Sequence, residues 1–246
     1  MKKISVALAV YNEEDNLRSC LESVKDLAWE IVIADGGSKD KTVQIAKEFG
    51  AKVIHTKNLQ NFHINKNMAI DAAGGDWILQ LDADEVATKE LVEEIIKVTQ
   101  SDSDLAGYWI PRRNFFLGKF LTKGGQYPDY TLRLYKKGKG RLPAEDVHEQ
   151  AVVQGKVGYL KNDLLHIRDK TFSIYIERFN RYTDLIVSQI SKPSFFDYIL
   201  IKPTFWFIKA YLRHRGYVDG FPGFVFALFS SLRFPVSYIK YKINHD

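Results

Sequence analysis

The first 99 residues alternate regularly between short apolar runs and segments with helical spacing. The runs are rich in aliphatic and β-branched residues, as in strands buried on both faces, and they cover residues 4–10, 31–34, 52–54 and 77–81. The segments between them place their apolar residues on one helical face. This alternation predicts an α/β domain with a mostly parallel, doubly wound sheet, whose ligands bind outside the carboxyl ends of the strands.

Local signals in the same segments set the ends of the expected helices. Asn12 is expected to cap the first helix, Gly50 to end the second and Thr88 to begin the fourth, with the third helix over residues 62–73. The single cysteine, Cys20, falls on the apolar face of the first helix, so we interpret it as a core residue. One cysteine also rules out an intrachain disulfide.

Three acids, Asp82, Asp84 and Glu85, follow the buried run 77–81 directly. Clustered carboxylates repel one another and resist leaving water unless a positive charge lies among them. In extended chain Asp82 and Asp84 would point to the same side, so the pair predicts a divalent metal site that also carries a diphosphate. The alternative is a solvated turn before the helix from Thr88. Glu85 is interpreted as a solvent-facing residue of that turn.

Polar residues also follow the first two strands, at what should be the same edge of the sheet. Tyr11 and Glu13 follow the first strand, and Asp35 follows the second. They are expected either to contact a nucleoside, or to do no more than end a strand and form a turn. The chain has no GxGxxG after its first strand and no GxxxxGK[ST], which removes the main support for a dinucleotide oxidoreductase or a P-loop protein.

Beyond residue 100 the alternation stops and the composition changes. Residues 107–160 carry aromatic runs and repeated glycines, typical of loops and short strands that build an acceptor face. A helical stretch begins near residue 172, and residues 192–246 hold eight Lys and Arg against three Asp and Glu, with 15 of the 33 aromatic residues. These shifts predict a catalytic domain and a helical, basic and aromatic extension. Their expected ranges are 1–170, with halves 1–99 and 100–170, and 171–246.

The extension offers two apolar stretches, and neither has the roughly 18 uninterrupted apolar residues of a spanning helix. Lys202–Pro203 interrupts the first apolar stretch, and Arg233 with Pro235 interrupts the second. Aromatic residues interleaved with Lys and Arg suit a segment that lies among lipid headgroups, so we expect peripheral binding to an anionic membrane surface. The alternatives are a helical cap on the catalytic domain or a dimer surface. Nucleic-acid binding has no recognised motif to support it.

Four motifs in this order and spacing, AVYNEEDNL, ADGGSKDKT, NKNMA and GDWILQLDADE, resemble those of the family 2 inverting glycosyltransferases, which have the nucleotide-diphospho-sugar transferase (GT-A) fold. The later segments GGQYPDYTLRLYKKGKGR, DVHE and LLHIRD resemble the bacterial members that build lipopolysaccharide core and related surface glycans. With RGYVDGFPGF in the extension, the resemblance covers nearly the whole chain. It implies a Rossmann-like, mostly parallel sheet flanked by helices, followed by the helical extension.

Matched position by position, the resemblance implies which residues bind the donor. Tyr11 and Asp35 would contact the base, and Glu13 would lie near the nucleoside. Lys66 would lie close to the nucleotide, and Asp82 would contact both the ribose and the metal ion.

The resemblance also implies a metal site and a catalytic base. Asp84 would bind Mn²⁺ or Mg²⁺ and through it the diphosphate, and His166 would complete the site, with a hydrogen-bonded structural role as the alternative for this histidine. Glu149 stands at the position of the base that takes the proton from the attacking hydroxyl. Glu145 and Asp146 stand four and three positions before Glu149, so the identity of the base stays open among these acids, and Asp146 is the first alternative.

On the acceptor side, Gly124 and Gly125 with Asp129 and Arg133 would form a glycine loop beside donor and acceptor. The implied activity is metal-dependent, inverting transfer of a hexose from a UDP-sugar to a saccharide hydroxyl of a lipid-linked acceptor, on the cytoplasmic face of the bacterial membrane. The alternatives are transfer to a polyprenyl phosphate, which needs little base catalysis, and a catalytically silent nucleotide-binding or membrane-adaptor protein.

Overall fold

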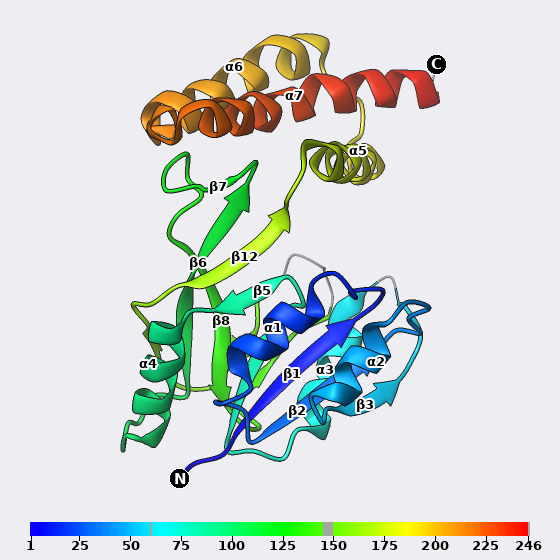
Figure 1. Ribbon diagram of the computed structural model, residues 1–246. Helices are drawn as coiled ribbons and strands as arrows, with labels where there is room; N and C mark the ends of the chain where they lie inside the picture. The colour runs from blue at the N-terminus through cyan, green and yellow to red at the C-terminus, as the bar shows by residue number, and fades with distance from the viewer. Residues whose placement is uncertain (60, 145–149, 246) are drawn as a thin grey trace. The chain divides into compact units, whose positions relative to one another are not determined.

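The computed structural model of the chain describes residues 1–59, 61–144 and 150–245 (Figure 1). Its first part alternates strand and helix, and the four expected strands are confirmed to within one residue at each end. In chain order the elements are β1 (Ile4–Val10), α1 (Leu17–Val24), β2 (Glu30–Asp35), α2 (Thr42–Glu48), β3 (Lys52–His55), α3 (Phe62–Ala72), β4 (Trp77–Leu81), β5 (Glu85–Ala87) and α4 (Lys89–Gln100).

Four parallel strands form the first part of the sheet, in the order β3-β2-β1-β4. The carboxyl ends of β1, β2 and β3 are level, because Val10 pairs with Asp35 and Asp35 with His55, and β4 ends two residues earlier, opposite Leu8 of β1. The loops that follow these strands therefore leave at one edge of the sheet, where a doubly wound fold binds its ligands.

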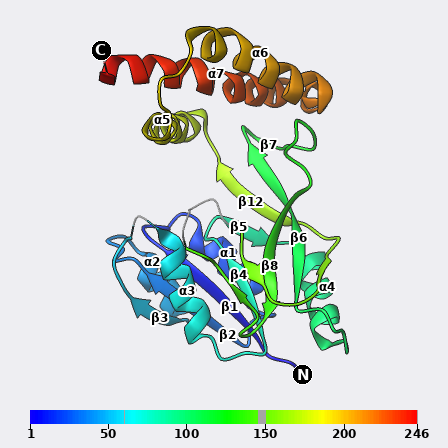
Figure 2. The same ribbon diagram turned by 180° about the vertical axis from the view of Figure 1, so that it is seen from behind.

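Helices cover both faces of this sheet, as the alternation predicts (Figures 1 and 2). Residues of α1, α2 and α4 share one core cluster with β1, which includes Leu21 and Val6. Residues of α3 belong to the second cluster, on the opposite face, which includes Ala69 and Ala7. Cys20 is fully buried in the first cluster, so its interpretation as a core residue is confirmed.

Two of the predicted helix boundaries are confirmed and one is wrong. Thr88 caps α4 by accepting a hydrogen bond from a backbone N–H one turn on, and Gly50 follows the end of α2 at a φ of +67°. The first helix begins only at Leu17, so Asn12 does not cap it. The Asn12 side chain instead accepts a hydrogen bond from the Lys39 N–H at 2.9 Å, because the loop after β1 is bonded to the loop after β2.

Antiparallel strands complete the sheet, and periodicity alone did not predict them. β8 pairs antiparallel with β4, and the order continues β4-β8-β6-β12-β5. β6 and β8 are longer than the short strands expected over 107–160. β11 pairs parallel with β6, and β9 and β10 form a separate two-stranded sheet. The strands after α4 are β6 (Gly107–Phe116), β7 (Lys119–Phe120), β8 (Asp129–Lys136), β9 (Gly140–Arg141), β10 (Val152–Val153), β11 (Val157–Tyr159) and β12 (Leu164–Asp169).

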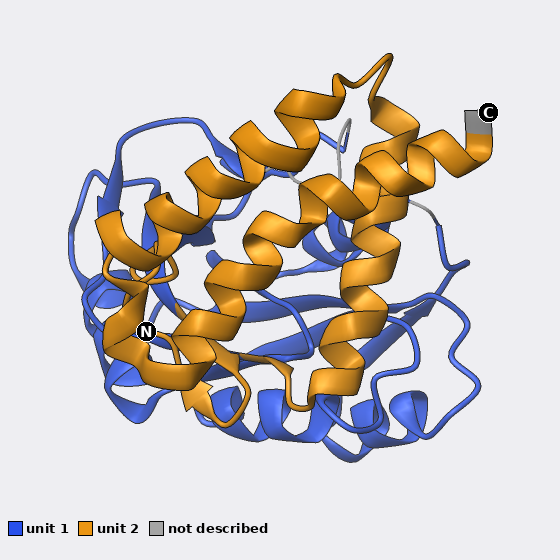
Figure 3. Cartoon of the chain, turned by 90° about the horizontal axis from the view of Figure 1, so that it is seen from above, with its two compact units in different colours: residues 1–112, 130–166 blue, residues 113–129, 167–246 orange. Residues whose placement is uncertain are grey.

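The chain divides into two compact units (Figure 3). Unit 1 holds residues 1–112 and 130–166, and unit 2 holds residues 113–129 and 167–246. The whole strand–helix alternation belongs to unit 1, whereas unit 2 combines the ends of β6 and β12, the strand β7 and the loop before β8 with the C-terminal helices.

Helices dominate unit 2, as expected from about residue 172 onward. α6 and α7 run side by side (Figure 3), and Phe229 of α7 contacts the rings of Tyr175 and Phe179 in α5. The elements are α5 (Phe172–Gln189), a continuous helical stretch of η1 (Asp197–Ile201), α6 (Lys202–Phe207) and η2 (Ile208–Arg213), the turn η3 (Gly216–Asp219), and α7 (Gly220–His245).

Helical structure continues through Pro203 and Pro235, the two prolines that interrupt the apolar stretches of the extension. Pro203 is the second residue of α6 and follows a π-helical turn, where the usual i to i−4 hydrogen bonding is already interrupted. Pro235 lies inside α7. Contacts of Phe229, before this proline, and of Lys240, after it, hold α7 against α5.

Within the described part of the chain, Gly216–Asn244 is the one helical stretch long and apolar enough to cross a membrane, by length and composition only.

Candidate functional site

The loops that follow β1 and β2 are bonded into one rim at the edge of the sheet. The Asn12 N–H donates to the Ser38 hydroxyl at 2.9 Å, and the Glu13 N–H donates to the Thr42 hydroxyl at 2.7 Å. The ring of Tyr11 is 40% exposed on this rim. The two loops predicted to contact a nucleoside are therefore neighbours, and an exposed aromatic ring is available for stacking.

Asp35 ends β2 at this rim and is almost fully buried. Its carboxylate accepts hydrogen bonds from the N–H groups of Gly37 and Ser38 at 3.2 Å each, and His55 Nδ1 lies 3.6 Å away. Asp35 therefore stabilises a turn, which was the predicted alternative to contact with a nucleoside. A carboxylate accepts about four hydrogen bonds, so these contacts fix its orientation without using its whole capacity, and contact with a base stays a prediction.

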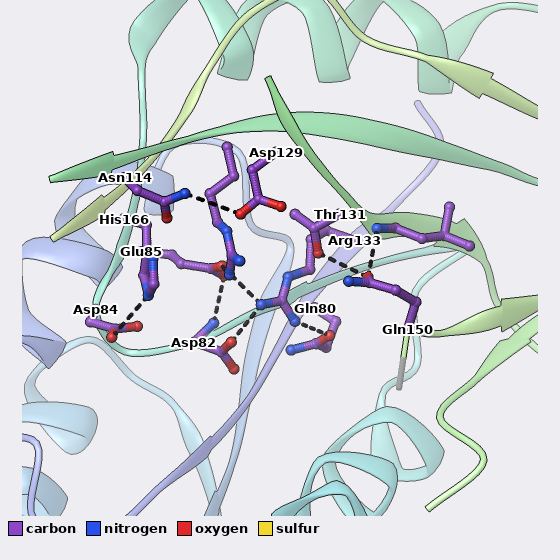
Figure 4. A network of polar contacts seen from close by, with 12 residues as sticks. Gln80, Asp82, Asp84, Glu85, Asn114, Asp129, Thr131, Arg133, Gln150 and His166 are labelled. Carbon is purple, nitrogen blue, oxygen red and sulfur yellow. Dashed lines mark hydrogen bonds and ion pairs between the residues drawn. The ribbon is translucent and has the colours of Figure 1, made fainter. Parts of the chain in front are cut away.

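Asp82 is ion-paired through both of its carboxylate oxygens, and Figure 4 shows the pair with Arg133. Lys66 Nζ, from α3, lies 2.5 Å from Oδ1, and the Arg133 guanidinium, from β8, lies 2.5 Å from Oδ2. Burial alone would raise the pKa of the Asp82 carboxyl, but the charges of Arg133 and Lys66 outweigh burial and hold that pKa well below its usual range. For this acid, protein side chains supply the positive charge that the sequence predicts a metal ion to supply.

Glu85 is fully buried, so the expectation that it faces solvent is wrong. Its carboxylate lies 2.8 Å from the Arg133 guanidinium and 3.4 Å from that of Arg112, and it accepts a hydrogen bond from the Asp82 N–H at 2.9 Å. Sequence reasoning missed the roles of Glu85 and Arg112. The available signal was an arginine inside the apolar run TLRLY, because a buried guanidinium needs a buried anion.

Asp84 takes a different partner from Asp82. Residues 83 and 84 form a turn, so the side-to-side alternation of extended chain does not apply to them. His166 Nε2 lies 3.3 Å from Asp84 Oδ2, and these two side chains are only 11% and 22% exposed. The antiparallel pairing of β12 with β5 places His166 opposite Glu85. The structure therefore brings together two of the predicted metal ligands, Asp84 and His166 (Figure 4).

A third metal ligand is not evident among the side chains that the structure describes. In residues 1–59, 61–144 and 150–245, no group of three or more His, Cys, Asp and Glu side chains is arranged to hold a metal ion. A carboxylate oxygen and an imidazole nitrogen are nevertheless donors that suit a divalent transition metal. The pair of Asp84 and His166 thus fits part of a coordination sphere, while both oxygens of Asp82 already contact cations.

Glu13 connects the rim to the acids that follow β4. Burial raises the pKa of the Glu13 carboxyl, a hydrogen bond from the Asn16 amide at 2.9 Å lowers it, and the negative charges of Asp84 and Asp82 raise it further. Such charge effects are appreciable only at short range. The ends of the first, second and fourth strands therefore converge, as the fold class predicts.

The predicted glycine loop does not include Arg133, which lies inside β8 in unit 1. Gly124–Gly125 belong to unit 2, where both residues adopt left-handed φ angles of +68° and +77°. The Gly124 N–H donates to the His214 carbonyl at 2.9 Å. Asp129, also in unit 2, accepts a hydrogen bond from the Asn114 amide at 3.1 Å. The loop and Arg133 are separate features because β8 extends the chain between them.

The glycine loop is anchored by a buried aspartate that sequence reasoning missed. Asp219 is 1% exposed and lies in the turn before α7. Its carboxylate accepts hydrogen bonds from the Thr122 N–H at 2.9 Å, the Thr122 hydroxyl at 2.7 Å and the Lys123 N–H at 2.8 Å. The segment RGYVDGFPGF was noted for its resemblance, but its lone acid among apolar residues was the signal for a buried carboxylate.

Replacing Asp219 with alanine is expected to lower the free energy of unfolding by about 2 kcal/mol, because hydrogen bonds to a charged group contribute about 1.5–3 kcal/mol. Urea denaturation of the variant and the wild type measures this change. The matched control is Asp184→Ala, which removes an exposed partner of Lys240 and should change stability by less than about 1 kcal/mol. Equally small changes in both variants would contradict an anchoring role for Asp219.

The candidate bases lie outside the described residues: Glu145, Asp146 and Glu149. The residues on either side of this segment are placed. The Ala144 carbonyl accepts a hydrogen bond at 2.6 Å from Asn61, the cap of the helix that carries Lys66. The Gln150 side chain accepts one at 3.2 Å from the hydroxyl of Thr131 in β8. Both flanks are therefore bonded to the elements that supply the cationic partners of Asp82.

Known proteins resemble this chain in sequence and fold. Residues 5–155 match the family described as glycosyl transferase family 2. The lipopolysaccharide core biosynthesis glycosyltransferase LpsC of Rhizobium meliloti is 28% identical over 235 residues, which cover 92% of this chain and 86% of LpsC. An uncharacterized glycosyltransferase of Rickettsia typhi is 30% identical over 240 residues, which cover 92% of this chain and 82% of the Rickettsia protein. Among solved structures, this chain is similar to mannosyltransferase PcManGT from Pyrobaculum calidifontis in complex with GDP-Man and Mn²⁺. The superposition covers 100% of this chain and 88% of the PcManGT chain, with a TM-score of 0.55 at 10% sequence identity.

Proposed function

Because this chain belongs to glycosyltransferase family 2 and is a glycosyltransferase of the GT-A fold, we propose that it is a metal-dependent, inverting hexosyltransferase. The donor is a nucleoside-diphospho sugar, a UDP-sugar in the first instance, and the acceptor is a saccharide hydroxyl of a lipid-linked glycan of lipopolysaccharide core or related surface glycans. The observation that carries the proposal is the pair of Asp84 and His166, 3.3 Å apart, beside the strand-end loops of unit 1. The similarity to LpsC supports the acceptor class.

The metal is proposed to be Mn²⁺ or Mg²⁺, held by Asp84 and His166. The two side chains supply a carboxylate oxygen and an imidazole nitrogen, and the complex of PcManGT with Mn²⁺ supports a divalent ion in this fold. When bound, the ion would neutralise the diphosphate leaving group. Asp82 is proposed to act at the ribose and to orient this region through its ion pairs, since Lys66 and Arg133 already occupy its oxygens.

The donor nucleoside is proposed to lie at the rim formed by the loops after β1 and β2. Tyr11 would stack on the base, Asp35 would accept from its polar edge, and Glu13 would lie near the nucleoside. Lys66 would lie close to the nucleotide, as its ion pair with Asp82 allows. Because the structure of PcManGT is a complex with GDP-Man, a GDP-sugar is the first alternative donor.

The acceptor side is proposed to involve the glycine loop, with Gly124, Gly125 and Asp129. A lipid-linked acceptor requires an enzyme that works at a membrane surface, and we place the protein peripherally on the cytoplasmic face of the bacterial cytoplasmic membrane. The balance of charge supports this placement, since unit 2 holds 15 Lys and Arg against 7 Asp and Glu.

Replacing Glu149 with glutamine is expected to lower kcat by about 100-fold, because a positioned general base contributes at least that much. The variant keeps the shape of the side chain but cannot accept the proton of the attacking hydroxyl. Transfer to a saccharide acceptor, followed with radiolabelled donor, measures the effect. Asp146→Asn is the matched control and should retain most of its activity.

The outcome of these substitutions separates the acceptor classes. If Asp146→Asn is the inactive variant, the base lies three residues earlier than we propose. Transfer to a polyprenyl phosphate is the rival, since its acceptor is already an anion. In that case activity would survive replacement of all three acids, Glu145, Asp146 and Glu149, by their amides.

A thermal-shift panel of UDP- and GDP-sugars, with and without Mn²⁺, tests the function directly. A donor at about 100 times its Kd should add about 2.7 kcal/mol of stability, and hence about 5 °C in Tm. We expect one donor class to stabilise the protein only in the presence of the metal. Metal-independent binding of UDP without turnover of any sugar donor would instead identify a silent nucleotide-binding protein.

A further inference from the structure

An exposed apolar stripe runs along the helical stretch Asp197–Arg213 of unit 2. Its members are spaced four, three and four residues apart, so they share one face of the helix. We call these residues the α6 stripe: Ile201, Phe205, Ile208 and Leu212, which are 62%, 55%, 48% and 55% exposed. Contiguous apolar surface of this kind marks a binding surface on a folded protein.

The other side of the same helical stretch packs inside unit 2. Phe207 and Tyr211 contact the ring of Phe224 in α7, at centroid distances of 6.1 and 5.8 Å, and Ala210 is 5% exposed. The packing of this side against α7 fixes the rotation of the helix. The α6 stripe is therefore held outward by the fold and cannot be buried by a small rotation of the helix.

Positive charge accompanies the stripe. From residue 197 to residue 219 the chain has four Lys and Arg and two Asp, of which Asp197 pairs with Lys202 at 2.7 Å and Asp219 is buried. Lys209 lies between stripe residues and 4.4 Å from the centroid of the Trp206 ring, and Arg213 is exposed directly after Leu212. Over the whole of unit 2 the formal charge is +8, whereas unit 1, with 20 Lys and Arg against 23 Asp and Glu, carries −3. The charge beside the stripe is complementary to an anionic surface.

We propose that the α6 stripe is the membrane-docking face of this protein and inserts at the headgroup level of an anionic phospholipid surface. An amphipathic helix with apolar side chains on one face and Lys and Arg beside them binds such a surface through buried apolar area and electrostatic attraction. Two copies of this chain would bring together two units of charge +8, which disfavours the stripe as a dimer interface. This proposal rests on the proposed function in one respect: the lipid-linked acceptor of that function lies at the membrane surface.

Sedimentation of the full chain with sucrose-loaded vesicles tests the docking face. The vesicles are phosphatidylcholine alone or with about 30% phosphatidylglycerol, and binding to the second kind should be stronger and should weaken with salt. The variant Phe205→Ser with Ile208→Ser should lower the partition coefficient about 30-fold. The matched control is Ile174→Ser with Leu185→Ser, two exposed apolar residues of α5, which should bind like the wild type.

Charge variants keep the test valid if the serine variant does not fold. Lys209→Gln and Arg213→Gln should each weaken binding to anionic vesicles about fivefold and leave binding to neutral vesicles unchanged. The proposal is overturned if the wild type does not bind anionic vesicles, or if it binds anionic and neutral vesicles equally. It is also overturned if the stripe variant Phe205→Ser with Ile208→Ser binds vesicles like the α5 control, or if this variant changes only the oligomeric state of the protein. The thermal-shift panel uses no lipid, so failure of donor binding with intact vesicle binding would reject the proposed function alone.

Discussion

The variant Arg133→Met is expected to lose about 3–5 kcal/mol of folding free energy, because it leaves the buried Glu85 and the partly buried Asp82 without their main cationic partner. Arg133 is itself buried, and its guanidinium contacts Gln80 at 2.5 Å, Asp82 at 2.5 Å and Glu85 at 2.8 Å. Methionine has a similar length and suits an apolar interior, so the loss would come from the charge rather than from a cavity. Urea denaturation at neutral pH measures it.

The control for Arg133→Met is Arg141→Met, which removes an exposed ion pair with Asp71 and should cost less than about 1 kcal/mol. Adding Asp82→Asn and Glu85→Gln to Arg133→Met should recover part of the loss, since neutral side chains need no cation. A loss in Arg133→Met as small as in the control would show that the buried network is not what holds β4, β5 and β8 together.

The same network predicts the pH dependence of stability. The pKa of Asp82 is held below its usual range in the folded protein, so its stabilisation is complete above the unfolded pKa of about 3.9 and is lost as the pH falls further. In Arg133→Met the pKa of Asp82 loses the lowering effect of Arg133 while burial still raises it, so ionised Asp82 destabilises the fold most at neutral pH. The difference between the two proteins should therefore shrink as the pH falls from about 7 to about 4, and a constant difference would contradict this account.

Periodicity could predict the parallel half of the sheet because each of its strands is buried on both faces and each helix has one apolar face. It could also predict that Glu13 and the acids after β4 converge, since parallel strands end at one edge. It could not place β8, whose position beside β4 depends on antiparallel pairing between distant segments, with Leu79 opposite Leu134. The helices through Pro203 and Pro235 likewise depend on tertiary packing that overrides a local signal.

The cationic partners of Asp82 could not be predicted for the same reason, whereas the family resemblance did place His166 with Asp84. Asp82 was located by its position after a strand, but its partners are side chains from distant elements, Lys66 from α3 and Arg133 from β8. Charge alone predicts that a partner exists and does not distinguish a metal ion from a guanidinium.

Replacing Asp84 with asparagine is expected to lower kcat by about 1000-fold or more, the largest catalytic effect among these predictions. The proposed metal neutralises the leaving diphosphate, and several kcal/mol of that stabilisation depend on its ligand. Mn²⁺ binding, measured by calorimetry in the presence of UDP, should weaken at least about tenfold. His166→Ala should weaken it similarly, because its Nε2 lies 3.3 Å from the Asp84 carboxylate.

Asp82→Asn provides the matched comparison, because the two acids stand two positions apart but have different partners. Asp84→Asn should lose metal binding while its unfolding curve stays close to that of the wild type. Asp82→Asn should lose stability, because Lys66 and Arg133 then face a neutral amide in a buried site. If Asp84→Asn keeps full turnover with Mn²⁺, the metal role assigned to Asp84 is wrong. If Asp82→Asn instead loses metal binding at unchanged stability, the metal ligand is Asp82, and its ion pairs with Lys66 and Arg133 must open when the donor binds.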